Sequence, residues 1–186
     1  MVRRYLPLPV PDDALLRIVE TARRGPSAGY SQGQSFVVVT DPGLREEIAR
    51  LAGEGSYVAK GFQPWVSEAP AHVVVCTSEQ DYHDRYRATD KLGPEVELEW
   101  AVPFWYVDAG CSMMLLLLAA VDEGLAAGFL ALKSYDGLRK LLGIPDVVQP
   151  IGIVTIGRPA PDRRSGSLDR GRKPAAEVIH HDRWGG

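Results

Sequence analysis

The sequence predicts one domain that mixes helices and strands, of the α+β or α/β class. Three short runs rich in β-branched residues have the character of buried strands, and segments with a helical apolar period lie between them. With 186 residues, of which 45% are apolar and 24% charged, the chain can bury one core but is short for two. We therefore expect residues 1–186 to form a single domain.

The first predicted helix follows Pro11, where two aspartates favour a helix start, and its apolar residues fall on one face until Gly25. A long loop comes next, residues 23–36, with the sequence RRGPSAGYSQGQSF. Its small and polar residues offer backbone N–H groups and hydroxyls at close range, which suits the polar edge of a flat heterocycle.

Two predicted strands, residues 35–40 and 71–77, follow the loop, with a short amphipathic helix at residues 44–52 between them. Residues 78–101 are polar, charged and rich in aromatic side chains. We expect this segment to be an excursion or lid and not part of the core.

The most apolar segment, residues 103–123, predicts a central helix, because it is apolar almost all round and a surface helix is not. It contains Asp108 and is marginal in length for a bilayer, so we expect it to be buried in protein and not in a membrane.

Two further strands are predicted at residues 126–132 and 149–156, with a short helix at residues 136–142 between them. The tail beyond them is basic. Arg170 and Arg172 lie two residues apart in a turn-rich segment, so both guanidinium groups can converge on one phosphate.

Composition and motifs exclude several classes of function. A net charge of −3 and a pI near 5.8 argue against a nucleic-acid partner. The four histidines lack the spacing of a metal site, and no nucleophile elbow, P-loop or dinucleotide fingerprint is present, so a cofactor explains the chain better than self-sufficient catalysis. Cys76 and Cys111 lie in apolar runs, as reduced core thiols do, and no secretion signal is visible, so we expect a cytoplasmic protein.

Three stretches resemble the nitroreductase family of FMN-dependent oxidoreductases, in order and at the usual spacing. They read ARRGPSAGYSQGQSFVVVTDP, YVDAGCSMMLLLLAAVDEGLAAGF and PIGIVTIGRPAPDRRSGSLDRGRKPAAEVIHHDRW, and the likeness runs from Val2 to Trp184. The resemblance implies an α+β fold, an α/β sandwich with a central, mostly antiparallel sheet flanked by helices. It also implies an intertwined homodimer with two FMN sites at the subunit interface.

The resemblance further implies which residues bind the flavin. The loop of one subunit would line the isoalloxazine ring held by the other, and residues 128–132 would place backbone N–H groups near the flavin N5. Arg3 would stabilise the anionic reduced flavin, and the basic pair in the tail would bind the phosphate. The expected cofactor-binding residues are Arg3, Arg4, Pro26, Ser27, Ala28, Tyr30, Gln32, Ala131, Leu132, Arg170 and Arg172.

Several aromatic side chains could shape an acceptor pocket, although the sequence favours simple packing for each of them: Trp65, Tyr82, Tyr86, Trp100 and Trp105. Tyr30 joins this set because it stands where the family usually has Asn, and we expect it to alter substrate preference.

A second departure lies at the amino terminus. Related chains have a helix and an Arg-Arg-Ser segment before the residues that match Val2 to Tyr5, so the first phosphate-binding arginine has no counterpart. Either the natural start lies upstream of Met1, which we favour, or the flavin is held less tightly. The loss of one charge-assisted contact would lower the affinity for FMN roughly ten- to a hundredfold.

The activity implied by the resemblance is transfer of hydride from NAD(P)H through flavin N5 to an electron-poor acceptor, such as a nitroaromatic or a quinone, in a ping-pong scheme. One alternative is a more specialised flavin enzyme of the same fold, such as a dehydrogenase, a reductive dehalogenase or a flavin-consuming synthase. Another is a non-catalytic homodimer with a decayed flavin site.

Overall fold

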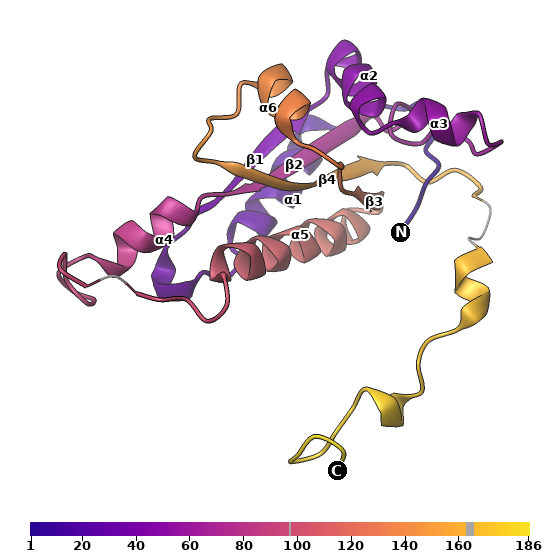
Figure 1. The fold of residues 1–186 in the computed structure, drawn as a ribbon. Coiled ribbons are helices and arrows are strands. Elements are labelled where there is room, and N and C mark those ends of the chain that lie inside the picture. Colours follow the sequence, from indigo (N-terminus) through magenta and orange to yellow (C-terminus); the bar gives the residue numbers. More distant parts are fainter. Residues whose placement is uncertain (97, 163–165) are drawn as a thin grey trace.

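The computed structural model describes residues 1–96, 98–162 and 166–186, and its centre is a four-stranded sheet in the order β1-β2-β4-β3 (Figure 1). Every neighbouring pair of strands is antiparallel, which confirms the expected α+β class. The strands are β1 (Gln34–Val39), β2 (Ala71–Thr77), β3 (Ala126–Leu130) and β4 (Gln149–Gly157).

Helices cover both faces of the sheet, as expected for a sandwich (Figure 1). On one face lie α1 (Asp12–Arg23) and α5 (Phe104–Asp122), and on the other lie α2 (Pro42–Leu51) and α6 (Asp136–Leu142). Two further helices, α3 (Glu54–Val58) and α4 (Glu79–Tyr86), were not predicted, because α3 has only five residues and α4 is polar at most of its positions and so shows little apolar period.

Strand β2 is buried along its whole length. Val73 and Val75 pack with α1 and α5, whereas Val74 and Cys76 pack with α2 and α6. Because successive side chains of a strand point to opposite faces, a strand covered on both faces must be apolar throughout. This explains why the sequence shows an unbroken apolar run here.

Two expectations about the polar segments need correction. Residues 78–101 are not simply an excursion, because Tyr82 on α4 is fully buried and its ring packs edge-on against Trp100 and Trp105. Strand β3 ends at Leu130, so the predicted strand residues Ala131 and Leu132 lie beyond it. β3 is an edge strand whose neighbouring strand is β4, and the ladder between them ends at the Leu130–Ile153 pair.

Helix α5 is buried on one side only, which corrects the expectation of a fully buried helix. By length and composition it could span a membrane, and 39% of its most apolar window is buried within the protomer. Its exposed side carries a seam in which residues recur at alternating steps of three and four, the spacing of paired helices. The seam consists of Phe104, Val107, Cys111, Met114, Leu118 and Val121. An exposed Cys111 also corrects its expected place in the core; both cysteines are free.

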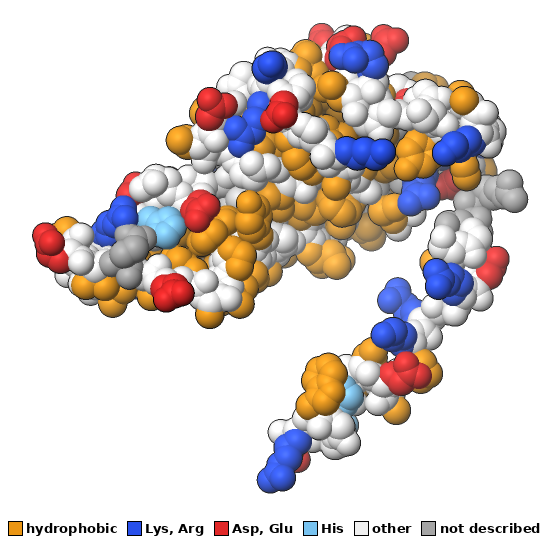
Figure 2. All heavy atoms as spheres, in the orientation of Figure 1, with side chains coloured by type: hydrophobic (Ala, Val, Ile, Leu, Met, Phe, Trp, Pro, Cys, Tyr) orange, Lys and Arg blue, Asp and Glu red, His pale blue; other side chains and the backbone are white. Residues whose placement is uncertain are grey.

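The carboxyl-terminal arm, residues 166–186, extends away from the body of the protomer and contains only two short 3₁₀ turns, Gly166–Arg170 and Ala175–Glu177 (Figure 1). Hydrophobic side chains occur on it among lysine and arginine (Figure 2). Trp184 is 92% exposed and packs only on the neighbouring His180 ring among the described residues, so it gains little from folding. Such an arm is typical of a segment that packs on a partner.

Two buried polar side chains hold the segment before β2. The Glu54 carboxylate accepts hydrogen bonds from the backbone N–H groups of Trp65 (2.7 Å) and Val66 (2.6 Å). His72 Nε2 lies 2.7 Å from the Val66 carbonyl oxygen, and because that oxygen only accepts, Nε2 carries the proton. Burial lowers the pKa of His72 to about 4, so the ring is neutral at pH 7.

We expect the free energy of unfolding to decrease as the pH falls from 6.5 to 4. In this window the unfolded chain protonates His72 at its ordinary pKa of 6.5, whereas the folded protein keeps the ring neutral down to about 4. The loss attributable to this group approaches about 3 kcal/mol.

Urea unfolding at pH 7, 5.5 and 4.5 measures this dependence. His72→Gln retains an amide donor for the Val66 carbonyl but does not titrate, so its unfolding free energy should depend less steeply on pH. Equal pH dependence in the variant and the wild type would contradict the assignment.

Candidate functional site

The small-residue loop predicted to meet the cofactor is held between α4 and α5. We call residues 25–34 the Pro-Ser loop. Both of its outer glycines are in close contact with these helices: a Cβ at Gly25 would lie 2.6 Å from Ser112 Oγ, and one at Gly33 would lie 2.7 Å from the Tyr82 ring. At Gly33 the added Cβ would also lie 2.8 Å from the Ser78 carbonyl oxygen, so a side chain there would displace backbone.

The buried carboxylate of Asp108 on α5 holds the middle of the loop. Asp108 is 5% exposed, and its Oδ2 accepts hydrogen bonds from the backbone N–H of Ala28 and from the hydroxyl of Tyr82, each at 2.8 Å. Burial, together with the neighbouring carboxylate, raises the pKa of Tyr82 well above its usual value, so the hydroxyl remains a donor. From α4, the guanidinium Nε of Arg85 donates to the Gly29 carbonyl oxygen at 2.9 Å.

The loop backbone is strained on the side that faces solvent. Gly29, Tyr30 and Gln32 all have positive φ values, of 62°, 61° and 54°. This left-handed conformation is easy for glycine but costly for tyrosine or glutamine. Tyr30 is 73% exposed and Gln32 is also exposed, so burial of their side chains does not repay the strain. Conformations of this kind concentrate at binding sites.

A second group of predicted site residues lies where the amino terminus crosses the sheet. The Val2 N–H donates to the Ala127 carbonyl oxygen of β3 at 3.0 Å, and the Arg3 guanidinium carbon lies 5.8 Å from the centre of the Trp65 ring. Arg4 is exposed beside it. The Tyr5 hydroxyl anchors this segment through a 2.8 Å hydrogen bond with Thr155 Oγ1.

One protomer does not bring these two groups together. The Pro-Ser loop leads into Gln34, which pairs with Thr77 at one end of β2, whereas Trp65 and the amino terminus lie by the other end, where Ala71 pairs with Ile156. Seven strand residues separate them by about 20 Å.

The remaining predicted residues lie in three places. Four of the aromatic side chains form one cluster beside the loop, namely Tyr82, Tyr86, Trp100 and Trp105. Arg170 and Arg172 are exposed on the carboxyl-terminal arm, and neither forms an ion pair within the described part of the protomer. Ala131 is exposed and Leu132 half-buried just after β3.

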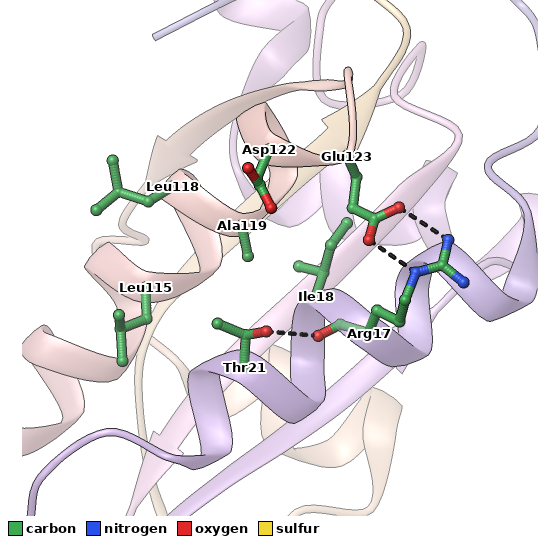
Figure 3. A pocket seen from close by; sticks show the side chains of 8 residues that line it. All are labelled: Arg17, Ile18, Thr21, Leu115, Leu118, Ala119, Asp122 and Glu123. Carbon is green, nitrogen blue, oxygen red and sulfur yellow. Dashed lines mark hydrogen bonds and ion pairs between the residues drawn. The ribbon is translucent and has the colours of Figure 1, made fainter.

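The hollow drawn in Figure 3 is not this site. It has a volume of about 320 Å³, lies between α1 and α5, and is bordered by the ion pair of Arg17 Nε and Glu123 Oε1 at 2.7 Å. None of the residues predicted to bind a cofactor or substrate lines it. This hollow therefore gives no support to the predicted cofactor site.

Sequence analysis missed the role of Asp108 and Arg85 in holding the loop. A signal for Asp108 was present, because a lone aspartate within an apolar helix requires hydrogen-bond donors. Nothing in the sequence pointed to Ala28 as one of those donors, since 80 residues separate the two.

Tyr30→Asn is expected to stabilise the protein by about 1 kcal/mol, because asparagine adopts the left-handed conformation more readily than tyrosine. Urea unfolding compared with wild type measures the change. Tyr30→Ala removes the same exposed ring but keeps an ordinary side chain at positive φ, so it should not stabilise. Equal stabilisation by alanine and asparagine would assign the effect to the ring and not to the backbone.

Comparison with known proteins agrees with the geometry. A sequence model of the Nitroreductase family matches residues 1–158. The chain is 25% identical to an NADPH-dependent oxidoreductase of Staphylococcus aureus over 187 residues, which cover 98% of this chain and 70% of that protein.

Solved structures share the fold. An NADPH:FMN oxidoreductase from Vibrio harveyi, complexed with NAD+, superposes with a TM-score of 0.71 and 24% identity, covering 98% of this chain and 73% of that one. A nitroreductase family protein from Streptococcus pneumoniae TIGR4 gives a TM-score of 0.74 and 20% identity, covering 97% and 94%. With its family model matched from residue 1 to residue 158, the chain belongs to the nitroreductase family.

Proposed function

We propose that this protein is an FMN-dependent NAD(P)H oxidoreductase that reduces an electron-poor acceptor such as a nitroaromatic or a quinone. The observation that carries the proposal is the Pro-Ser loop. In this chain the loop is held by contacts with α4 and α5, while its strained residues Tyr30 and Gln32 remain exposed. The relatives named as NADPH-dependent oxidoreductases support the choice of electron donor.

The residues present fit a flavin mononucleotide. Arg170 and Arg172 are exposed and have no ion-pair partner in the described part of the protomer, so both guanidinium forks are available to a phosphate. Arg3, over Trp65, supplies a cation for the ring system, and the Pro26-Ser27-Ala28 stretch supplies backbone at close range. When bound, FMN supplies the two-electron chemistry that links NAD(P)H oxidation to reduction of the acceptor.

The proposal requires two copies of the chain. The Pro-Ser loop and Arg3 lie at opposite ends of β2 within one protomer, so a site that uses both must take one from each of two copies. The exposed seam of α5 supplies an apolar surface with the spacing of helix pairing. The carboxyl-terminal arm supplies further exposed apolar side chains that could pack on a second copy. In this homodimer the seam faces protein and not lipid, and we expect the enzyme in the cytoplasm.

We expect the purified protein to show flavin absorbance after incubation with FMN and desalting. Replacing both Arg170 and Arg172 with alanine should weaken FMN binding at least about a hundredfold, because two charge-assisted contacts to the phosphate are lost. Quenching of FMN fluorescence measures the dissociation constant. Arg183→Ala, which removes another exposed arginine from the same arm, serves as the control.

Unchanged FMN affinity in the double variant would show that Arg170 and Arg172 do not bind the phosphate.

Steady-state oxidation of NADH and NADPH with a quinone then tests the activity, and parallel double-reciprocal plots are expected for ping-pong turnover. Flavin that is bound but not reduced by either nucleotide would favour a specialised flavin enzyme, and failure to bind FMN would favour a non-catalytic homodimer.

Leu118→Glu should convert a dimer into a monomer, because it places a carboxylate within the apolar seam. We expect association to weaken at least about tenfold and FMN binding to weaken with it. Sedimentation velocity compares the wild type, expected at twice the 20.3 kDa chain mass, with the variant.

Leu16→Glu is the matched control, since Leu16 on α1 is 62% exposed and Leu118 is 58% exposed. A wild-type protein that is monomeric and still retains FMN would contradict the two-copy site.

A further inference from the structure

We propose that Asp108 is a positioning residue for the flavin. Its carboxylate oxygen Oδ2 accepts a hydrogen bond from the Ala28 N–H and so fixes that peptide. The same oxygen accepts from the hydroxyl of Tyr82, which belongs to the aromatic segment of residues 78–101. The Pro-Ser loop and this aromatic segment then act as one unit. The inference rests on the proposed function, because only there does Ala28 meet a flavin.

The geometry selects one conformation of the loop. A buried carboxylate must accept hydrogen bonds, and Asp108 Oδ2 has two donors at 2.8 Å, the N–H of Ala28 and the O–H of Tyr82. If the Ala28 peptide rotated, the carboxylate would lose one of these donors in a site from which water is excluded. The charge on α5 therefore sets the orientation of a backbone group on a surface loop.

Two further contacts join the loop to the aromatic segment. The Ser78 N–H donates to the Gly33 carbonyl oxygen at 2.9 Å, and Arg85 Nε donates to the Gly29 carbonyl oxygen at 2.9 Å. Asp90, within the same segment, holds the Arg85 guanidinium in turn through two hydrogen bonds of 2.7 and 2.8 Å. The middle and the end of the loop are thus both fixed from residues 78–90.

The absence of room at Gly29 completes the coupling. A Cβ there would lie 2.7 Å from the Tyr86 ring, which itself packs edge-on against Trp100 with ring centres 4.8 Å apart. A shift of the aromatic cluster must therefore displace the loop. It follows that substitutions behind the loop alter FMN affinity, and not only the KM for an acceptor.

The test uses Asp108→Asn, which keeps the shape and removes the charge, and Tyr82→Phe, which removes one hydroxyl. Thr77→Val is the matched control. The Thr77 hydroxyl is fully buried and donates to the Trp105 carbonyl oxygen of α5, the helix that carries Asp108, at 3.0 Å. Only the backbone of Thr77, which the substitution leaves unchanged, pairs with the end of the loop at Gln34. Thermal unfolding checks that the control loses comparable stability, so that a general loss of stability is separated from a local one.

Two measurements are made on each protein. Hydrogen–deuterium exchange of the peptide covering residues 25–34 is recorded on flavin-free protein, and the FMN dissociation constant is measured by fluorescence quenching. We expect loop amides in Asp108→Asn to exchange at least about tenfold faster and the FMN dissociation constant to rise about tenfold. Tyr82→Phe should shift both in the same direction by a smaller factor, and Thr77→Val should change neither by more than about twofold.

Unchanged loop exchange and unchanged FMN affinity in Asp108→Asn would overturn the proposal, as would equal effects in Thr77→Val. If Asp108→Asn does not fold, Tyr82→Phe decides by the same two measurements. A wild-type protein that binds no FMN would instead contradict the proposed function. Loop exchange would still decide whether Asp108 fixes the loop, with faster exchange supporting it and unchanged exchange refuting it.

Discussion

Strand β2 has no exposed residue, and the positions of the helices follow from that burial. Its alternate side chains need apolar cover on both faces of the sheet, which α1 with α5 and α2 with α6 supply. The strands at the two edges, β1 and β3, carry the loop and the amino-terminal crossing to opposite ends of β2. The buried strand thus determines both the core and the separation of the two halves of the site.

The polar groups of this fold are used where the chain must be held without secondary structure. Glu54 organises the segment before β2 by accepting from two backbone N–H groups, and Asp108 organises the Pro-Ser loop by accepting from the Ala28 N–H and the Tyr82 hydroxyl. Such charges are costly to bury, and they remain favourable only while their donors stay in place. Both segments therefore gain a definite conformation that their own sequences do not encode.

Much of the fold follows from sequence patterns, because apolar periodicity records burial directly. The strand at residues 71–77 was predicted with its correct limits, and α6 was too, since Gly143 ends it with a positive φ. Contacts between distant residues leave no local pattern, so the pairing of Ala28 with Asp108 could not be foreseen. The seam of α5 was hidden for another reason: when both sides of a helix are apolar, the sequence does not tell which side meets the core and which stays exposed.

The distance between the Pro-Ser loop and Arg3 in each protomer has a thermodynamic consequence. If two copies complete each site, cofactor binding and self-association become a single linked equilibrium. Dilution then releases cofactor by mass action, and added cofactor holds the copies together at concentrations where they would otherwise separate. Occupancy would depend on how much of this protein a cell contains as well as on how much flavin is free.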